Sequence, residues 1–178
     1  MAGSPPRPEP FRAETYTLGA SGLQLSPLRR DEAARLGTAL AAIEPWSRYQ
    51  TSPANLSALF SPSPDGGIRL GVRLGDRDQL IGVVVIRSPW LAGPYMQFLA
   101  MLPGYQGRGL GRAVLQWFEA EARRSGARNI WICAVSFNEG ALRLYSSCGY
   151  AQVAVLDDLI KPGFAEVFMR RKLSPSDN

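Results

Sequence analysis

Histidine is absent from this 178-residue sequence, and cysteine occurs only at Cys133 and Cys148. Without histidine, Ser-His-Asp and Cys-His catalysis are excluded, and so is the commonest protein ligand of zinc. Two cysteines are too few for a disulfide framework, and their spacing is not that of a metal site. We therefore expect no bound metal, and we interpret both cysteines as small, reduced hydrophobic residues.

Long apolar runs are also missing. No stretch approaches the roughly 20 apolar residues that span a bilayer, and no charged segment followed by an apolar one marks a signal peptide. We therefore expect a cytoplasmic protein with no membrane partner. The opening MAGSPPRPEP is rich in proline and too poor in apolar residues to offset the entropy of ordering. We expect a disordered lead-in over residues 1–13, one domain over 14–173 and a tail over 174–178.

The sequence has few acidic residues relative to basic ones, and its net charge is +5. A basic protein can bind nucleic acid, a membrane or a polyanionic cofactor. Aromatic and basic residues are not interleaved as they are in many nucleic-acid surfaces, so we expect no nucleic-acid partner. Several arginines instead gather around one glycine-rich stretch: Arg108, Arg112, Arg123, Arg124 and Arg128. This clustering favours a local anion site.

Hydrophobic periodicity predicts an alternation of helices and strands. Strands are expected over residues 23–28, 68–74, 80–87, 95–102, 130–135, 150–156 and 165–172. Helices are expected from a cap at Asp31 to about Ile43, after Pro53, over about 109–125, and over 138–147. Hairpins in the middle of the chain and β-α-β crossovers later predict a mixed α/β domain built around a central sheet.

The stretch GYQGRGLGRAVLQWF (104–118) places three alternating glycines between a predicted strand and a predicted helix. The first amides of a helix lack intrahelical partners and carry partial positive charge, so they bind phosphate well. Glycines let the backbone approach a ligand closely. A P-loop would need Gly-Lys-Ser/Thr where this chain has Gly111-Arg112-Ala113, and the glycine spacing of a dinucleotide-binding fold is also absent.

The segment Gln106-Gly107-Arg108-Gly109-Leu110-Gly111 resembles the acetyl-CoA signature of the GNAT family of N-acetyltransferases. The later NEGALRLYSSCGY (138–150) resembles the second motif of that family. The resemblance extends over about residues 23–172 and is strongest from 95 to 150. It implies a mixed, mostly antiparallel central sheet flanked by helices, with the fourth and fifth strands (95–102 and 130–135) splayed apart. It also implies acetyl-CoA as co-substrate and acetyl transfer to an amine.

The resemblance further implies roles for individual residues. Backbone amides from Gly107 to Arg112 would bind the CoA pyrophosphate, and a strand edge would pair with the pantetheine arm. Asn138 would hydrogen-bond that arm, and Tyr145 would lie near the sulfur. The full cofactor set implied is Leu99, Met101, Gln106, Gly107, Arg108, Gly109, Leu110, Gly111, Arg112, Asn138 and Tyr145. Taken singly, Asn138 also suits a plain helix cap and Tyr145 a core residue.

Amide formation requires the acceptor ammonium to lose a proton and the CoA thiolate to gain one. We expect Tyr145 to be the general acid and a strand amide near Met101 to stabilise the oxyanion. Related enzymes often carry a glutamate on the fifth strand, where this chain has Cys133. The exposed-looking Glu44 is our leading candidate base; the alternatives are Glu139, Asp157, Asp158 or a relayed water.

The short segment EPWS (44–47) resembles one found in N-terminal acetyltransferases of ribosomal proteins. Trp46 and Tyr49 would then form an apolar wall of the acceptor pocket, although Trp46 equally suits packing against the sheet. The acceptor stays open between a peptide amino terminus and a small amine. A module that binds acetyl-CoA without turnover is the alternative function, and a homodimer is an open assembly.

Overall fold

The computed structural model describes residues 11–75 and 78–174, and its element order is close to the predicted one. The strands are β1 (Tyr16–Leu18), β2 (Leu23–Pro27), β3 (Ile68–Leu74), β4 (Gln79–Trp90), β5 (Gly93–Met101), β6 (Asn129–Val135), β7 (Ala151–Asp157) and β8 (Ala165–Lys172). The helices are α1 (Arg30–Ala41), α2 (Pro53–Phe60), α3 (Leu110–Arg124) and α4 (Glu139–Ser147). One sheet runs β1-β2-β3-β4-β5-β6-β8-β7 and is antiparallel except between β5 and β6. The predicted mixed, mostly antiparallel sheet flanked by helices is confirmed.

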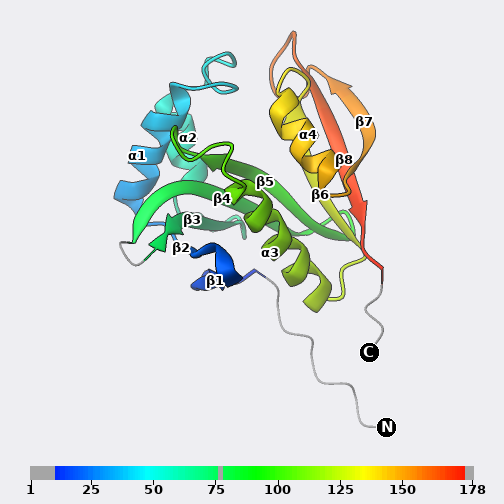
Figure 1. The fold of residues 1–178 in the computed structure, drawn as a ribbon. Helices are drawn as coiled ribbons and strands as arrows, with labels where there is room; N and C mark the ends of the chain where they lie inside the picture. The colour runs from blue at the N-terminus through cyan, green and yellow to red at the C-terminus, as the bar shows by residue number, and fades with distance from the viewer. Residues whose placement is uncertain (1–10, 76–77, 175–178) are drawn as a thin grey trace.

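Helices cover both faces of the sheet (Figure 1). Strand β4 shows how the sequence directs this, because successive side chains of a strand point to opposite faces. Val83 and Val85 belong to a core with α1 and α2, whereas Val84 and Ile86 belong to a core with α3. A continuous apolar run is therefore required in β4, since neither of its faces meets water.

Two details differ from the sequence predictions. Helix α1 begins at Arg30 after an Arg29 cap, not at Asp31, because the Glu32 carboxylate accepts the backbone N–H of Arg29 at 3.0 Å. The ring of Phe11 is buried against Phe118, so the packed chain begins inside the segment expected to be disordered. The rest of the expected lead-in, 1–10, and of the tail, 175–178, lies outside the described residues.

Strands β5 and β6 separate soon after they meet. Their parallel pairing comprises only Tyr95 with Trp131 and Met96 with Ile132. At the same point the register between β4 and β5 shifts, so that Gln97 bulges out of the ladder. A bulge bends its strand and increases the local twist. Beyond it β5 stays with β4 and β6 with β8, which opens the V-shaped gap seen in Figure 1. The expected splay is confirmed.

A buried ion pair fixes α1 on the sheet. The Arg73 guanidinium on β3 donates to both carboxylate oxygens of Glu32, at 2.8 and 2.9 Å, with both side chains almost fully buried. Burial alone would raise the pKa of Glu32, but hydrogen bonds from the Arg29 amide and from Arg73 lower it below its ordinary value. The pair anchors the helix whose C-terminal end leads into residues 44–49.

Candidate active site

One cleft of about 510 Å³ lies where the end of β5, the glycine loop, the start of α3 and one face of α4 meet. It contains most of the residues expected to bind a cofactor. Those lining it are Glu44, Trp46, Leu99, Met101, Gln106, Gly107, Gly109, Leu110, Gly111, Arg112, Asn138 and Tyr145, together with Pro45, Ala100, Tyr105, Gly140, Ala141 and Leu144. Segments more than 90 residues apart in sequence thus form a single wall.

The glycine loop presents free amides to this cleft. Gly107 and Gly109 adopt φ values of +70° and +78°, a left-handed region that favours glycine. Gly109 caps α3, and the first intrahelical bond runs from the Ala113 amide to its carbonyl at 3.2 Å. The amides of residues 110–112 therefore have no intrahelical acceptor, and they lie at the positive end of the helix dipole. This arrangement suits a phosphate group.

The two arginines of the loop are directed differently. Arg112 is anchored on the end of α4, where it donates to the Ser147 hydroxyl at 2.7 Å and lies 3.4 Å from the Cys148 sulfur. Arg108 is exposed, stands over the ring of Tyr105 and is not part of the cleft lining. Backbone groups, more than guanidinium groups, thus define the anion site.

The splayed edge of β5 offers main-chain hydrogen bonds. The Leu102 amide donates to the Ile81 carbonyl at 2.8 Å, so residue 102 faces β4. Because main-chain groups alternate along a strand, those of Leu99 and Met101 point the other way, into the gap left by β6. The Met101 carbonyl accepts a bond of 3.0 Å from Gln106 Nε2. This edge suits an extended polar arm that adds to the sheet.

Asn138 and Tyr145 share the α4 wall, as their spacing of seven residues predicts. The Asn138 side chain accepts the Ala141 amide at 3.2 Å, so it caps the helix and also borders the cleft. Tyr145 is buried, and this burial, with smaller contributions from Cys133 and Cys148, raises the pKa of its phenol. The phenol is therefore protonated at neutral pH and able to donate.

Glu44 and Trp46 lie at the rim of the same cleft. Trp46 stacks on Phe98 of β5 with ring centroids 4.8 Å apart, so it both packs on the sheet and lines the cleft. The Glu44 side chain is exposed. Within the described residues its carboxylate makes no hydrogen bond or ion pair, and it borders a second, smaller hollow with Phe137.

A buried carboxylate that the sequence analysis missed lies beyond Tyr49. The Tyr49 hydroxyl donates to Glu166 Oε1, and the Cys133 thiol donates to Glu166 Oε2 at 3.5 Å. Glu166 is only 3% exposed. These residues come from the α1–α2 segment, β6 and β8, and only tertiary pairing brings them together. The available signal was a glutamate between apolar neighbours in the predicted strand over residues 165–172.

Both donors to Glu166 keep their protons at neutral pH. Burial, together with the neighbouring Glu166 carboxylate, raises the pKa of the Cys133 thiol to about 12. Burial and the hydrogen bond to Glu166 likewise raise the pKa of the Tyr49 phenol. Cys133, which occupies the strand position where a base was expected, is therefore a hydrogen-bond donor.

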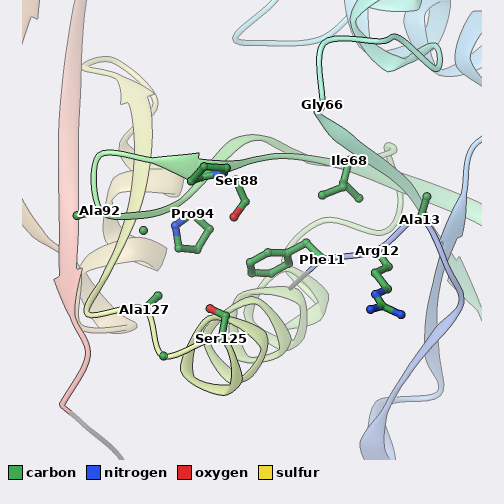
Figure 2. A pocket seen from close by; sticks show the side chains of 13 residues that line it. Phe11, Arg12, Ala13, Gly66, Ile68, Ser88, Ala92, Pro94, Ser125 and Ala127 are labelled. Carbon is green, nitrogen blue, oxygen red and sulfur yellow. The ribbon is translucent and has the colours of Figure 1, made fainter. Parts of the chain in front are cut away.

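A larger cavity of about 700 Å³ lies elsewhere, where the β4–β5 hairpin faces the C-terminal end of α3 (Figure 2). Phe11, Ile68 and Pro94 project into it, and Arg12 is the one charged side chain among the described residues that line it. None of the predicted site residues borders it. Its size therefore does not make it the better candidate for chemistry.

An anion-binding helix terminus, an open strand edge and a buried phenol along one cleft are features that suit an acyl-CoA-dependent transferase. The family model for the acetyltransferase (GNAT) family matches residues 35–150. The chain belongs to this family.

Curated relatives match over shorter segments. Streptothricin acetyltransferase of Streptomyces lavendulae is 27% identical over 88 residues, which are 49% of this chain and 47% of that protein. The ribosomal protein bS18-alanine N-acetyltransferase of Escherichia coli K12 is 33% identical over 57 residues, which are 32% of this chain and 38% of that protein. The chain thus spans less than half the length of these relatives in the matched regions.

Solved structures support the same fold. The Escherichia coli ribosomal-protein-S18-alanine N-acetyltransferase superposes with a TM-score of 0.66 at 17% identity, over 88% of this chain and 97% of that one. A Vibrio cholerae spermidine N-acetyltransferase chimera gives 0.67 at 20% identity, over 85% and 96%. At such identities the likeness concerns the fold and leaves the acceptor open.

Across the described residues, no helix has the length and apolar character needed to cross a membrane. The same part of the chain holds no group of three or more histidine, cysteine, aspartate or glutamate side chains arranged to bind a metal ion.

Proposed function

We propose that this protein is an N-acetyltransferase that moves an acetyl group from acetyl-CoA directly to a primary amine, either a peptide amino terminus or a small amine. One observation carries the proposal: the free amides after Gly107, the β5 edge at Leu99 and Met101 that has no pairing with β6, and the Tyr145 phenol all border one cleft. We also propose that it acts in the cytoplasm, where acetyl-CoA is available.

In this proposal the cofactor extends from the start of α3 into the gap between β5 and β6. Amides of residues 107–112 bind the pyrophosphate, and main-chain groups of Leu99 and Met101 pair with the pantetheine arm. The Met101 carbonyl exchanges its bond from Gln106 for one from the ligand. Asn138 contributes its side-chain NH₂ group, since its oxygen is already used in the helix cap.

The proposed reaction is a direct transfer. The neutral amine attacks the thioester carbonyl, a β5 amide near Met101 stabilises the oxyanion, and Tyr145 donates a proton to the departing thiolate. The raised pKa of Tyr145 keeps its proton available for that step. Glu44, exposed on the rim, is one candidate for the base that deprotonates the amine.

Two features support an amine acceptor. The named relatives acetylate an alanine of ribosomal protein bS18 or the antibiotic streptothricin. The rim of the cleft carries the aromatic ring of Trp46, which suits an apolar group beside the reacting nitrogen; Tyr49, further along the same segment, is not among the residues that line the cleft.

An acceptor panel tests this proposal. Purified protein is incubated with acetyl-CoA and, separately, an alanine-initiated peptide, streptothricin, spermidine, phenylalaninamide or 2-phenylethylamine, while released thiol and the acetylated product are followed. We expect acetylation of at least one of these amines. Acetyl-CoA binding in calorimetry without product from any amine would instead establish the non-catalytic binding module.

A further inference from the structure

Glu166 differs from the other buried carboxylates of the described chain. The buried carboxylates of the described chain are Glu32, Glu121 and Glu166 itself. Glu32 pairs with Arg73, and Glu121 pairs with Arg124. Within the described residues Glu166 pairs with no arginine or lysine. A buried charge normally has a cationic partner, because desolvation is otherwise too costly. Glu166 is therefore the one buried carboxylate among the described residues without a cationic partner.

The Glu166 carboxylate also keeps free positions for accepting hydrogen bonds. Two neutral donors, the Tyr49 hydroxyl and the Cys133 thiol, each bind one oxygen of Glu166. A carboxylate has about four lone-pair sites, so further hydrogen bonds are available to it. Tyr49 is half-buried while Glu166 is almost fully buried, so Tyr49 is the more accessible residue of the pair.

This cluster adjoins the expected reaction centre. Cys133 follows Ile132, the last β6 residue that pairs with β5, so it lies where the gap between the strands opens. It donates to Glu166, and a charge on its sulfur would raise the pKa of the Tyr145 phenol. Tyr95, on β5 where the strands begin to separate, is close enough for charges on Cys133, Glu166 and Tyr145 to raise its pKa too. The carboxylate and the candidate acid thus both lie near the same thiol.

The surroundings indicate what kind of cation fits. The Tyr49 ring packs against Phe137 and Phe164, with centroids 5.9 and 5.0 Å away. Arg48 lies over Phe137, and Lys161 Nζ donates to the Tyr49 carbonyl at 2.6 Å. A single carboxylate among aromatic rings, with cations at its periphery, favours one ammonium attached to an apolar group and repels a second positive charge.

We propose that Glu166 is the proton acceptor for the acceptor amine and that Tyr49 relays the proton to it, the acceptor being a monocationic amine with an apolar neighbour. The proposal rests on the proposed acetyltransferase function. The ammonium donates one proton to the Tyr49 oxygen while the Tyr49 proton passes to Glu166. The freed amine forms the C–N bond as the C–S bond of acetyl-CoA breaks.

The remaining protons balance. Tyr145 protonates the departing thiolate and recovers a proton from the newly bonded nitrogen, and Glu166 releases its proton to solvent. The products are the acetylated amine, CoA and one proton. In this scheme Tyr49 touches the acceptor, Glu166 acts through it, and Glu44 stays on the rim without accepting the proton.

Substitution at both ends of the relay tests the proposal. With an amine that the wild-type protein acetylates, Glu166→Gln and Tyr49→Phe should each lower kcat by about 10²-fold, within the usual range for loss of acid–base catalysis. Acetyl-CoA affinity should stay unchanged, and Glu166→Asp should restore part of the rate. Glu14→Gln, at an exposed glutamate on the N-terminal segment, is the matched control and should behave as wild type.

Acceptor basicity separates a proton relay from a purely structural role. An α-amino group has a pKa near 8 and an alkylammonium one near 10, so at pH 8 about half of the phenylalaninamide is neutral, whereas 2-phenylethylamine is almost wholly protonated. Glu166→Gln should therefore impair the second amine more than the first, whereas misfolding would impair both equally. Among the described residues, the titratable groups near Glu166 are Tyr49, Cys133 and Tyr95. Cys133 and Tyr95 are unchanged in Glu166→Gln, Glu166→Asp and Tyr49→Phe.

The outcomes distinguish this proposal from the function on which it rests. If the wild-type protein acetylates no amine, the proposed function fails. If it acetylates an amine and Glu166→Gln or Tyr49→Phe keeps the full kcat, or if both amines are impaired equally, the relay is wrong while the function stands. Preference for spermidine over the two phenyl amines would contradict the monocationic acceptor.

Discussion

Met96 and Ile132 form the last residue pair between β5 and β6, and the Gln97 bulge follows immediately on β5. One extra residue in the ladder thus coincides with the start of the gap into which Leu99 and Met101 point their main-chain groups. The parallel pairing that begins at Tyr95 holds the two strands together below the gap. The cleft is therefore a consequence of strand register, and its residues were recognisable in the sequence only through their motifs.

The glycine loop gives the first prediction. Gly109→Val should weaken acetyl-CoA binding by at least about tenfold, because a side chain at φ +78° is strained by about 1–2 kcal/mol and its methyl groups would occupy the space above the α3 amides. Gly66→Val is the matched control: Gly66 also has positive φ and open space around its Cβ position, but it lies outside the cleft. Calorimetric titration with acetyl-CoA measures both, and equal affinity of the two variants would contradict the loop assignment.

The second prediction concerns the general acid. Tyr145→Phe should lower kcat by about 10²-fold while leaving acetyl-CoA affinity nearly unchanged, because only the departing thiolate needs the phenol proton. Tyr150→Phe is a matched control, since Tyr150 is also buried and its hydroxyl has no hydrogen-bond partner among the described residues. Steady-state kinetics and calorimetry on both variants decide the matter, and an unchanged kcat in Tyr145→Phe removes Tyr145 from this role.

The third prediction concerns the buried pair of α1 and β3. Arg73→Met should reduce the free energy of unfolding by about 1–3 kcal/mol, because it removes the buried partner of Glu32 and leaves that carboxylate with only the exposed Arg29 guanidinium, 2.7 Å away. Adding Glu32→Leu should recover much of that loss. Arg35→Met, which removes the exposed pair between Arg35 and Asp31, should cost less than about 1 kcal/mol. Urea denaturation at neutral pH measures all three.

The same pair predicts a pH dependence. The pKa of Glu32 is lower in the folded protein than in the unfolded chain, so its stabilisation is fully present above the unfolded value of about 4.3 and is lost as the pH falls through the folded value. The free energy of unfolding should therefore decrease below about pH 4.3. This decrease should be smaller in the Glu32→Leu, Arg73→Met double variant than in the wild type. Parallel declines in both proteins would show that other carboxylates dominate.

The fourth prediction concerns Cys133. With a pKa of about 12, its thiol should hold roughly 10³-fold less thiolate at pH 8 than an ordinary cysteine, partly offset by the greater nucleophilicity of a basic thiolate. In a Cys148→Ser background, iodoacetamide should alkylate Cys133 tens of times more slowly than the same protein unfolded in urea. Glu166→Gln should speed alkylation in the folded protein, since it removes a neighbouring negative charge. Equal rates before and after unfolding would contradict the buried cluster.

Much of the fold followed from local patterns. The limits of β3 and β8 were predicted to the residue, and β3 is bounded on both sides by glycines, Gly67 and Gly75. Strand β1 was not predicted, since its three residues carry too little periodicity. The cap of α1 was misplaced because Arg29 receives its partner from Glu32, within the helix. Phe11 was assigned to a disordered segment because nothing in its proline-rich surroundings indicates the rings of α3 on which it packs.

The sequence by itself determined which residues form the proposed cofactor side of this protein. A glycine loop and a helix start are contiguous in the chain, and Asn138 and Tyr145 lie on one helix, so local geometry brings each set together. Only the tertiary structure brought together the residues of the proposed acceptor side. Tyr49, Cys133 and Glu166 come from three distant segments, and their contact depends on the pairing of β6 with β8 and on the position of the α1–α2 segment. The partners of a charged residue in a strand cannot be identified until the neighbouring strands are known. The role proposed for Glu166 therefore depended on the tertiary structure.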